Sequence, residues 1–180
     1  MKATGIVRRI DDLGRVVIPK EIRRTMRIHE GDPLEIYTSA DGEVIFKKYS
    51  AINEMASSAS QVAEVMTRLA NCPTVVFDRD HVVAVAGVQK KEFSERRVSR
   101  ALEEYLESRR NYIRSSSAEA KVFPVEGVDQ AALACSPILA SGDVTGAVAF
   151  LAPNDSAVAN EVQQNLIQAA AQFLGKQIED

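Results

Sequence analysis

The first fifty residues contain too little chain to form a stable fold by themselves. Turn residues divide them into short strand-like runs at residues 5–10, 15–18, 34–38 and 43–48, and one short helix at residues 20–26. A β-rich unit of this size buries little apolar surface, so it usually needs a disulfide, a metal or a second chain. Both cysteines, Cys72 and Cys135, lie outside this segment. We therefore expect residues 1–50 to fold as an oligomer.

Three local signals set the connections within this segment. The run from Asp11 to Gly14 predicts a turn, because glycine accepts a positive φ angle. Pro19 stands where a helix can begin, since its missing N–H is not needed in the first turn. Asp41 and Gly42 separate the last two strands and predict a hairpin.

The charge distribution separates this segment from the rest. The net charge of the chain is −3. Residues 1–27 hold eight basic and three acidic residues, which gives +5, whereas residues 49–180 hold 12 basic and 17 acidic residues, which gives −5. Such asymmetry is typical of a nucleic-acid module joined to a domain with another task.

Arginines dominate the basic segment. Arg8 and Arg15 flank the first turn, and Arg23 and Arg24 lie on the short helix. Arginine suits DNA recognition because its guanidinium can bond guanine in a bidentate manner and neutralise phosphates. On composition alone, the same run could be an ordinary solvated surface.

The remaining chain begins with a predicted helix at residues 51–70 that carries a heptad repeat of apolar residues and ends at Asn71 to Pro73. The repeat positions are Ile52, Met55, Ala59, Val62, Met66 and Leu69. We interpret residues 51–72 as a helical linker.

Residues 73–180 predict a mixed α/β domain. Strands are expected at residues 74–77, 82–86, 121–125, 132–138 and 144–151, and helices at residues 94–110 and 157–178, the latter capped near Asn154. The last helix also repeats apolar residues at heptad-like spacing: Val158, Val162, Leu166, Ala169 and Phe173. We expect the first and last helices to pair in a bundle that links chains into a tetramer.

Catalytic signals are absent from the sequence. It shows no nucleophile–base pair, carboxylate pair or phosphate-binding glycine loop, and we expect neither an enzyme, nor a cofactor, nor a metal site. Without a signal peptide or a long apolar run, we expect a cytoplasmic protein that does not enter a membrane. Cys72 and Cys135 are expected to be small buried hydrophobes, with a redox switch as the alternative.

The N-terminal string closely resembles the DNA-binding domain of AbrB-type transition-state regulators. The resemblance covers about fifty residues and is carried by TGIVR at residues 4–8, LGRVVIP at 13–19, IRRT at 22–25, GD at 31–32, LEI at 34–36 and KKY at 47–49. It implies a swapped-hairpin β-barrel formed by two interleaved chains. It also implies DNA contacts by Arg8, Arg15, Arg23 and Arg24, assisted by Arg9 and Lys2.

The full chain resembles the stage V sporulation protein T family, which joins this domain to a C-terminal GAF-like domain. The length, the heptad linker, Asp78 to Asp80, Gly142-Asp143 and the run from Gly146 to Val148 all fit. The expected fold is α+β: a DNA-binding domain at residues 1–50, a linker helix at 51–72 and a GAF-like domain at 73–180.

The resemblance further implies a regulator that activates and represses late genes in the forespore, at A·T-rich DNA read largely through its shape. The GAF-like domain could bind a small molecule, with Gly87, Lys90 and Lys91 over a pocket, or serve only in dimerisation. Two competing functions remain: an antitoxin with the same N-terminal domain, and a sensor or scaffold whose barrel serves only assembly.

Overall fold

The computed structural model describes residues 4–179 and divides the chain into two compact units. The N-terminal unit is Met1–Tyr49 and the C-terminal unit is Ser50–Asp180. Lys2, one of the expected DNA contacts, lies outside the described residues.

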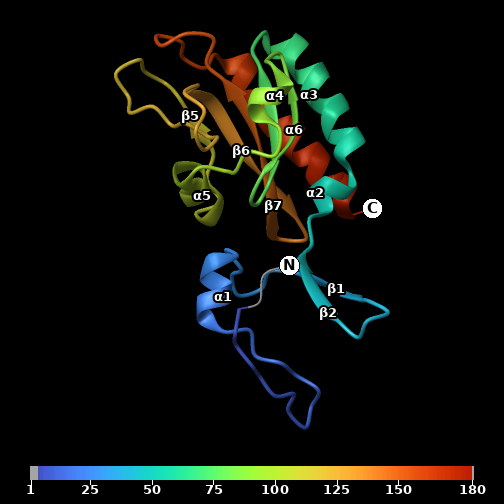
Figure 1. Ribbon diagram of the computed structural model, residues 1–180. Helices are drawn as coiled ribbons and strands as arrows, with labels where there is room; N and C mark the ends of the chain where they lie inside the picture. The colour runs from blue at the N-terminus through green and yellow to red at the C-terminus, as the bar shows by residue number, and fades with distance from the viewer. Residues whose placement is uncertain (1–3, 180) are drawn as a thin grey trace. The chain divides into compact units, whose positions relative to one another are not determined.

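The N-terminal unit contains one helix and one hairpin (Figure 1). Helix α1 spans Lys20–Thr25, close to the predicted helix. Strands β1 (Leu34–Thr38) and β2 (Val44–Lys48) pair antiparallel, with Leu34 opposite Lys48 and Thr38 opposite Val44. Gly42 has a φ of +81° in the connecting turn, so the predicted hairpin is confirmed.

The two strands predicted at residues 5–10 and 15–18 are not formed in the described chain. This prediction was wrong for the single chain, and the reason is physical. A strand exists only beside another strand that receives its hydrogen bonds, and neither segment has such a neighbour here. The turn between them is formed, because the Asp11 N–H donates to the Arg15 carbonyl at 3.0 Å and the Gly14 N–H to the Asp11 carbonyl at 3.0 Å.

The C-terminal unit is built on a five-stranded antiparallel sheet in the order β4-β3-β7-β6-β5. The strands span Thr74–Asp78 (β3), Val82–Ala86 (β4), Tyr112–Ile113 (β5), Ala132–Ala140 (β6) and Asp143–Leu151 (β7). Inner strand β3, which lies between β4 and β7, reads Thr-Val-Val-Phe-Asp, and four of its five residues are buried. A strand covered on both faces is apolar throughout, so this run predicts layers on each side.

Helices supply those layers. The helices α2 (Ala51–Glu54), α3 (Ala56–Ala70) and α6 (Glu161–Glu179) pack on one face (Figure 1). Residues from α4 (Lys90–Phe93) and α5 (Arg100–Glu107) join the core of the other face. Alternate residues of β7 separate accordingly: Val148 and Phe150 belong to the first core, and Ala147 and Ala149 to the second.

Three predicted elements of this unit differ from the structure. The helix expected at residues 94–110 is only α5, because Ser99 caps it through a hydrogen bond from the Leu102 N–H, and Val98 pairs instead with Val125. Residues 121–125 form that isolated bridge and no strand. The last helix begins at Glu161, where Asn160 and Gln163 exchange reciprocal N-terminal hydrogen bonds, and not near Asn154.

The segment interpreted as a linker lies within the C-terminal unit as two helices that meet at Met55. Its heptad face packs on the sheet of the same unit: Ile52 and Ala59 are fully buried, and Val62 is 8% exposed. Leu69, the last position of the repeat, is 58% exposed.

Candidate nucleic-acid interface

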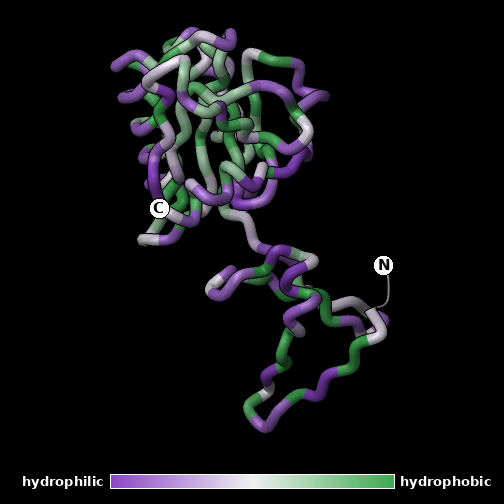
Figure 2. Tube along the Cα trace, turned by 90° about the vertical axis from the view of Figure 1, so that its left-hand side faces the viewer, coloured by the Kyte–Doolittle hydropathy of each residue, from purple (hydrophilic) through white to green (hydrophobic). Residues whose placement is uncertain are grey.

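The N-terminal unit has almost no interior of its own. Among residues 4–49, Pro19 is the single buried residue. Figure 2 shows hydrophobic stretches interspersed with hydrophilic ones along this part of the tube. Monomeric proteins rarely leave so much apolar surface uncovered. The exposed large apolar residues here are Ile6, Val7, Ile10, Leu13, Val16, Val17, Met26, Ile36, Tyr37, Val44, Phe46 and Tyr49.

Asp11 organises the first turn. Its carboxylate accepts hydrogen bonds from the backbone N–H groups of Leu13 (3.0 Å) and Arg15 (2.8 Å). It also accepts from Nε of the Arg15 side chain at 2.8 Å. The bonds from the Arg15 backbone and side chain hold the pKa of Asp11 below its ordinary value. One carboxylate therefore shapes the turn and orients an arginine at its edge.

The five described arginines of the expected DNA surface, Arg8, Arg9, Arg15, Arg23 and Arg24, are all exposed. Arg8 and Arg15 stand on opposite sides of the turn, and Nη1 of Arg8 donates to the Val7 carbonyl at 3.4 Å. Arg23 and Arg24 lie in the last turn of α1, where a positive charge is favoured by the helix dipole. Their contact with DNA stays a prediction.

A polar cluster that the sequence did not reveal joins the end of α1 to the hairpin. The Asp32 side chain is 2% exposed; it accepts from the His29 N–H at 2.8 Å and lies 3.7 Å from Nζ of Lys48. Lys48 also donates to the Arg27 carbonyl at 2.7 Å. The cluster fixes the arginine-bearing helix to β2, and the Gly31-Asp32 pair was its only visible sign in the sequence.

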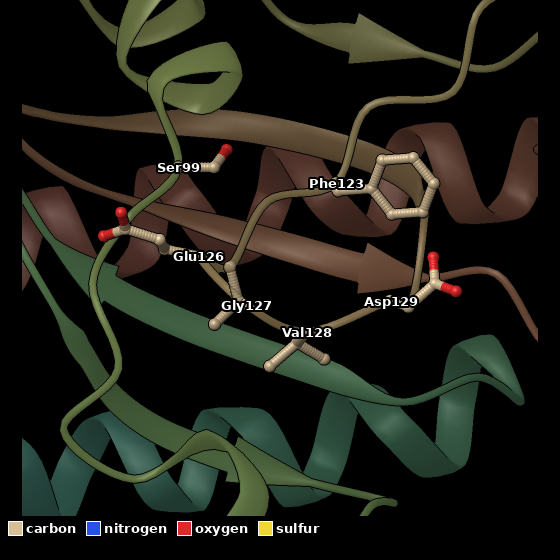
Figure 3. Close-up of a pocket in the computed structure, with 7 residues that line it drawn as sticks. Ser99, Phe123, Glu126, Gly127, Val128 and Asp129 are labelled. Carbon is tan, nitrogen blue, oxygen red and sulfur yellow. The ribbon is translucent and has the colours of Figure 1, made fainter.

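The C-terminal unit has a shallow hollow of about 340 Å³. Figure 3 shows the carboxylates of Glu126 and Asp129 at opposite ends of it, so no set of polar groups converges there. Gly87, Lys90 and Lys91 are not among the residues that line it. The hollow is lined by Ser99, Phe123, Val125, Glu126, Gly127, Val128 and Asp129.

The structure also bears on the two cysteines, on metal binding and on membrane-spanning helices. Burial raises the pKa of the Cys72 thiol to about 11 and raises that of Cys135 as well, which keeps both in the unreactive thiol form. Within residues 4–179, no group of three or more His, Cys, Asp or Glu side chains could hold a metal ion. No helix in the described part of the chain is long and apolar enough to cross a membrane.

Comparison with known proteins decides the family. The family model described as Stage V sporulation protein T C-terminal, transcription factor, matches residues 54–179. Stage V sporulation protein T of Bacillus subtilis (strain 168) is 44% identical over 181 residues, which is 99% of this chain and 99% of that protein. The chain belongs to the stage V sporulation protein T family. It is accordingly a DNA-binding transcription regulator of sporulation.

The N-terminal and C-terminal parts of the chain are similar to different known proteins. The N-terminal DNA recognition domain of the Bacillus subtilis regulator AbrB is 62% identical over 28% of this chain and 92% of that chain, with a TM-score of 0.25; this likeness is one of sequence. The model of the MazE bacterial antitoxins matches residues 7–52. The GAF domain of Thermosynechococcus elongatus PixJ has a TM-score of 0.55 at 13% identity, over 73% of this chain and 89% of that chain. The C-terminal unit therefore has the GAF fold, and the α+β prediction is confirmed.

Proposed function

We propose that this regulator binds double-stranded DNA through the exposed arginines of a dimeric N-terminal unit. The observation that carries the proposal is the coincidence of two features in residues 4–49. Five arginines stand exposed, and most of the large apolar side chains are uncovered. A second copy would cover the apolar residues and double the arginines on one surface.

Residues 5–10 and 15–18 support pairing between chains. They have strand-like sequences, a formed turn between them, and no adjacent strand in their own chain. Exchange of these segments between two copies would supply the missing hydrogen-bond partners. The resulting swapped-hairpin barrel would bring together Arg8, Arg15, Arg23 and Arg24 from both chains, with Arg9 and Lys2 assisting.

The C-terminal unit supplies the second contact between copies in this proposal. Helix α6 buries Ile167 and Leu174 in its own core, yet Val162 and Phe173 on another face are 60% and 52% exposed. Helix α3, packed beside it, exposes Leu69. Pairing of these helices with those of another copy would bury this apolar surface and join dimers into a tetramer.

As a regulator, the protein would activate some late forespore genes and repress others, in the cytoplasm of that compartment. Arginines that track phosphates, with few base contacts, favour A·T-rich sites recognised through their shape. The GAF-fold unit would adjust DNA binding through oligomerisation and a small-molecule ligand, without catalysis. The antitoxin alternative is disfavoured, because the antitoxin match ends at residue 52 and a transcription-factor family covers the rest.

The test is fluorescence anisotropy of an A·T-rich promoter fragment with the full chain at several salt concentrations. The double variant Arg8→Ala, Arg15→Ala removes two arginines per chain. If a dimer uses all four against phosphates, the slope of log affinity against log salt becomes less steep by up to about 4. The control is Arg96→Ala, Arg100→Ala, which removes the same charge from exposed sites of the C-terminal unit.

Unchanged DNA affinity in the Arg8→Ala, Arg15→Ala variant would show that these two arginines do not contact DNA. Equal losses of DNA affinity in both double variants would show that the effect comes from net charge alone. Either result would favour a sensor or scaffold in which the N-terminal unit serves only assembly.

A further inference from the structure

Arg114 is the largest side chain of the described chain that is completely buried. It follows edge strand β5, and its backbone is held on both sides. Its N–H donates to the Leu133 carbonyl at 3.0 Å, and its own carbonyl accepts from the Ala159 N–H at 2.9 Å. The guanidinium is therefore fixed inside the unit and is not a surface group.

Among the described residues, only one of the three guanidinium nitrogens finds a hydrogen-bond partner. Nη2 donates to the carbonyl oxygens of Asp155 at 2.6 Å and Ser117 at 3.4 Å. Nε and Nη1 are buried without a hydrogen-bond partner. Because a guanidinium has five N–H donors and stays protonated in proteins, three of its donors remain unmatched. Buried donors that have no acceptor are unfavourable.

The carboxylates of Asp155 and Glu119 make their hydrogen bonds elsewhere, although the charge of Arg114 contributes to lowering the pKa of Asp155. The Asp155 carboxylate accepts from Nζ of Lys121 at 2.6 Å, although its own backbone carbonyl contacts Arg114. The Glu119 carboxylate accepts from the Ser115 N–H at 3.1 Å. The hydrogen bonds of the described residues thus give Arg114 only neutral carbonyl acceptors.

A second unmatched polar group lies beside the first. Tyr112 stands two residues earlier, and residues at this spacing in an extended chain face the same side. Its hydroxyl is buried and its O–H has no acceptor among the described residues, although the Val122 backbone approaches its oxygen closely enough to lower the pKa. Burial raises the pKa of Tyr112, and the charge of Arg114 opposes that rise, so the two groups are close enough to interact.

We propose that Tyr112 and Arg114 form a binding site for a small oxyanion, the carboxylate or phosphate group of a ligand of the GAF-fold unit. Such a group accepts from N–H and O–H donors and balances the guanidinium charge. This inference rests on the proposed ligand-binding role of the C-terminal unit and not on the proposed DNA surface.

Residues 115–121 provide the entrance to this site. Every residue of this segment is exposed. Its attachment through Lys121 and Asp155 is a surface ion pair, with side chains 33% and 91% exposed. Surface ion pairs contribute little stability, and the bond from Nη2 of Arg114 to the Ser117 carbonyl is long at 3.4 Å. The segment can therefore open for a ligand at small cost and close again over it.

The first test is an NMR titration of the full-length protein labelled with ¹⁵N-arginine. The Nε–H signal of Arg114 is assigned by its loss in Arg114→Met. Phosphate and acetate are added in separate arms, and chloride at matched ionic strength is the reference. We expect a saturable shift with one or both oxyanions. A shift equal to that in chloride, or no shift, would overturn the proposal.

The second test is thermal unfolding in the same three salts. Oxyanion binding raises the Tm of the wild type relative to chloride. Arg114→Met is expected to lose this difference, and Tyr112→Phe to weaken oxyanion binding about tenfold, as expected for one hydrogen bond to a charged group. The exposed Arg110→Met variant is the control and should behave as the wild type.

A purely structural role for these residues predicts a different result: both variants would lower the Tm equally in all three salts, which would refute the proposal. If Arg114→Met does not fold, the Tyr112→Phe variant and the titration of the wild type still test the oxyanion site. DNA anisotropy on the same preparations separates the two proposals, because loss of the oxyanion effect leaves DNA affinity in place.

Discussion

Both units of this chain must cover their apolar side chains, and they differ in whether their own chain does so. The C-terminal unit buries both faces of its sheet with its own helices and connections, in two separate cores. The N-terminal unit buries only Pro19 among its described residues. The C-terminal unit is thus complete within one chain, whereas the N-terminal unit leaves apolar side chains that we propose a second copy covers.

Arginine shows the same contrast. In the N-terminal unit the charge is presented to solvent on a turn and a short helix. In the C-terminal unit Arg114 is enclosed, and most of its donors face no acceptor. An exposed arginine set suits a large polyanion, whereas an enclosed guanidinium suits a small anion.

The largest expected effect compares one phenylalanine from each unit. Phe150 is fully buried between the sheet and its helices, and Phe150→Ala should lower the free energy of unfolding by about 3–5 kcal/mol. This loss should not depend on protein concentration. Phe46 is 44% exposed in the single chain; Phe46→Ala should weaken assembly, so its effect should grow as the protein is diluted. Urea denaturation at two concentrations measures both.

A concentration-independent loss of stability for both variants would show that the N-terminal unit is complete in one chain. No loss at all for Phe46→Ala would show that this side chain stays exposed in the assembly.

One glycine in each unit shows the same difference between the units in the backbone. In α6, a Cβ on Gly175 would stand 2.1 Å from the Leu139 carbonyl oxygen of β6. Gly175→Ala must push the helix from the sheet, at about 1–3 kcal/mol. Gly14 has open space around it but a φ of +75°, so Gly14→Ala should cost about 1 kcal/mol in strain. Thermal unfolding of both variants tests the order, and a larger loss for Gly14→Ala would contradict it.

The two units also differ in how much of their structure can be predicted from the sequence. Strands β3, β4, β6 and β7 were predictable because their apolar runs and their partners lie in one chain. The strands expected at residues 5–10 and 15–18 were not found, since periodicity reports an apolar face and cannot say which chain covers it. The heptad repeats had the same ambiguity. Ile52 and Ala59 face their own sheet, whereas Val162 and Phe173 of α6 face outward.

The candidate sites were predictable to different degrees. The basic segment could be found from charge alone, because its arginines are adjacent in sequence. The pairing of Asp11 with Arg15 and the burial of Asp32 depend on local geometry that composition does not report. Arg114 gave no signal, since a lone arginine in a strand–loop junction is normally exposed; only three-dimensional packing distinguishes it.

A smaller effect is expected from Asp11→Ala. The variant loses the acceptor of two backbone N–H groups and of Nε of Arg15, so the turn loosens and Arg15 loses its orientation. We expect DNA affinity to fall about threefold to tenfold, the range for one or two hydrogen bonds of this kind. Asp12→Ala is the control, because it removes an equal charge from the same turn. Equal gains in affinity for both variants would mean that Asp11 acts only as a negative charge near DNA.

The smallest effect is the pH dependence of this turn. The pKa of Asp11 is lower in the folded chain than its ordinary value near 3.8. The stabilisation of the turn by the ionised Asp11 carboxylate is therefore fully present above that value and is lost as the pH falls through the folded pKa. The arrangement of Arg15 should therefore be constant from pH 5 to 8 and change only below about pH 4. An NMR titration of the Asp11 carboxyl carbon measures this. Asp155 gives the comparison in the C-terminal unit, because Lys121 lowers its pKa in the same way. If Asp11 titrates at the ordinary value while Asp155 does not, the turn is not formed in solution without DNA, and its order would come from the complex.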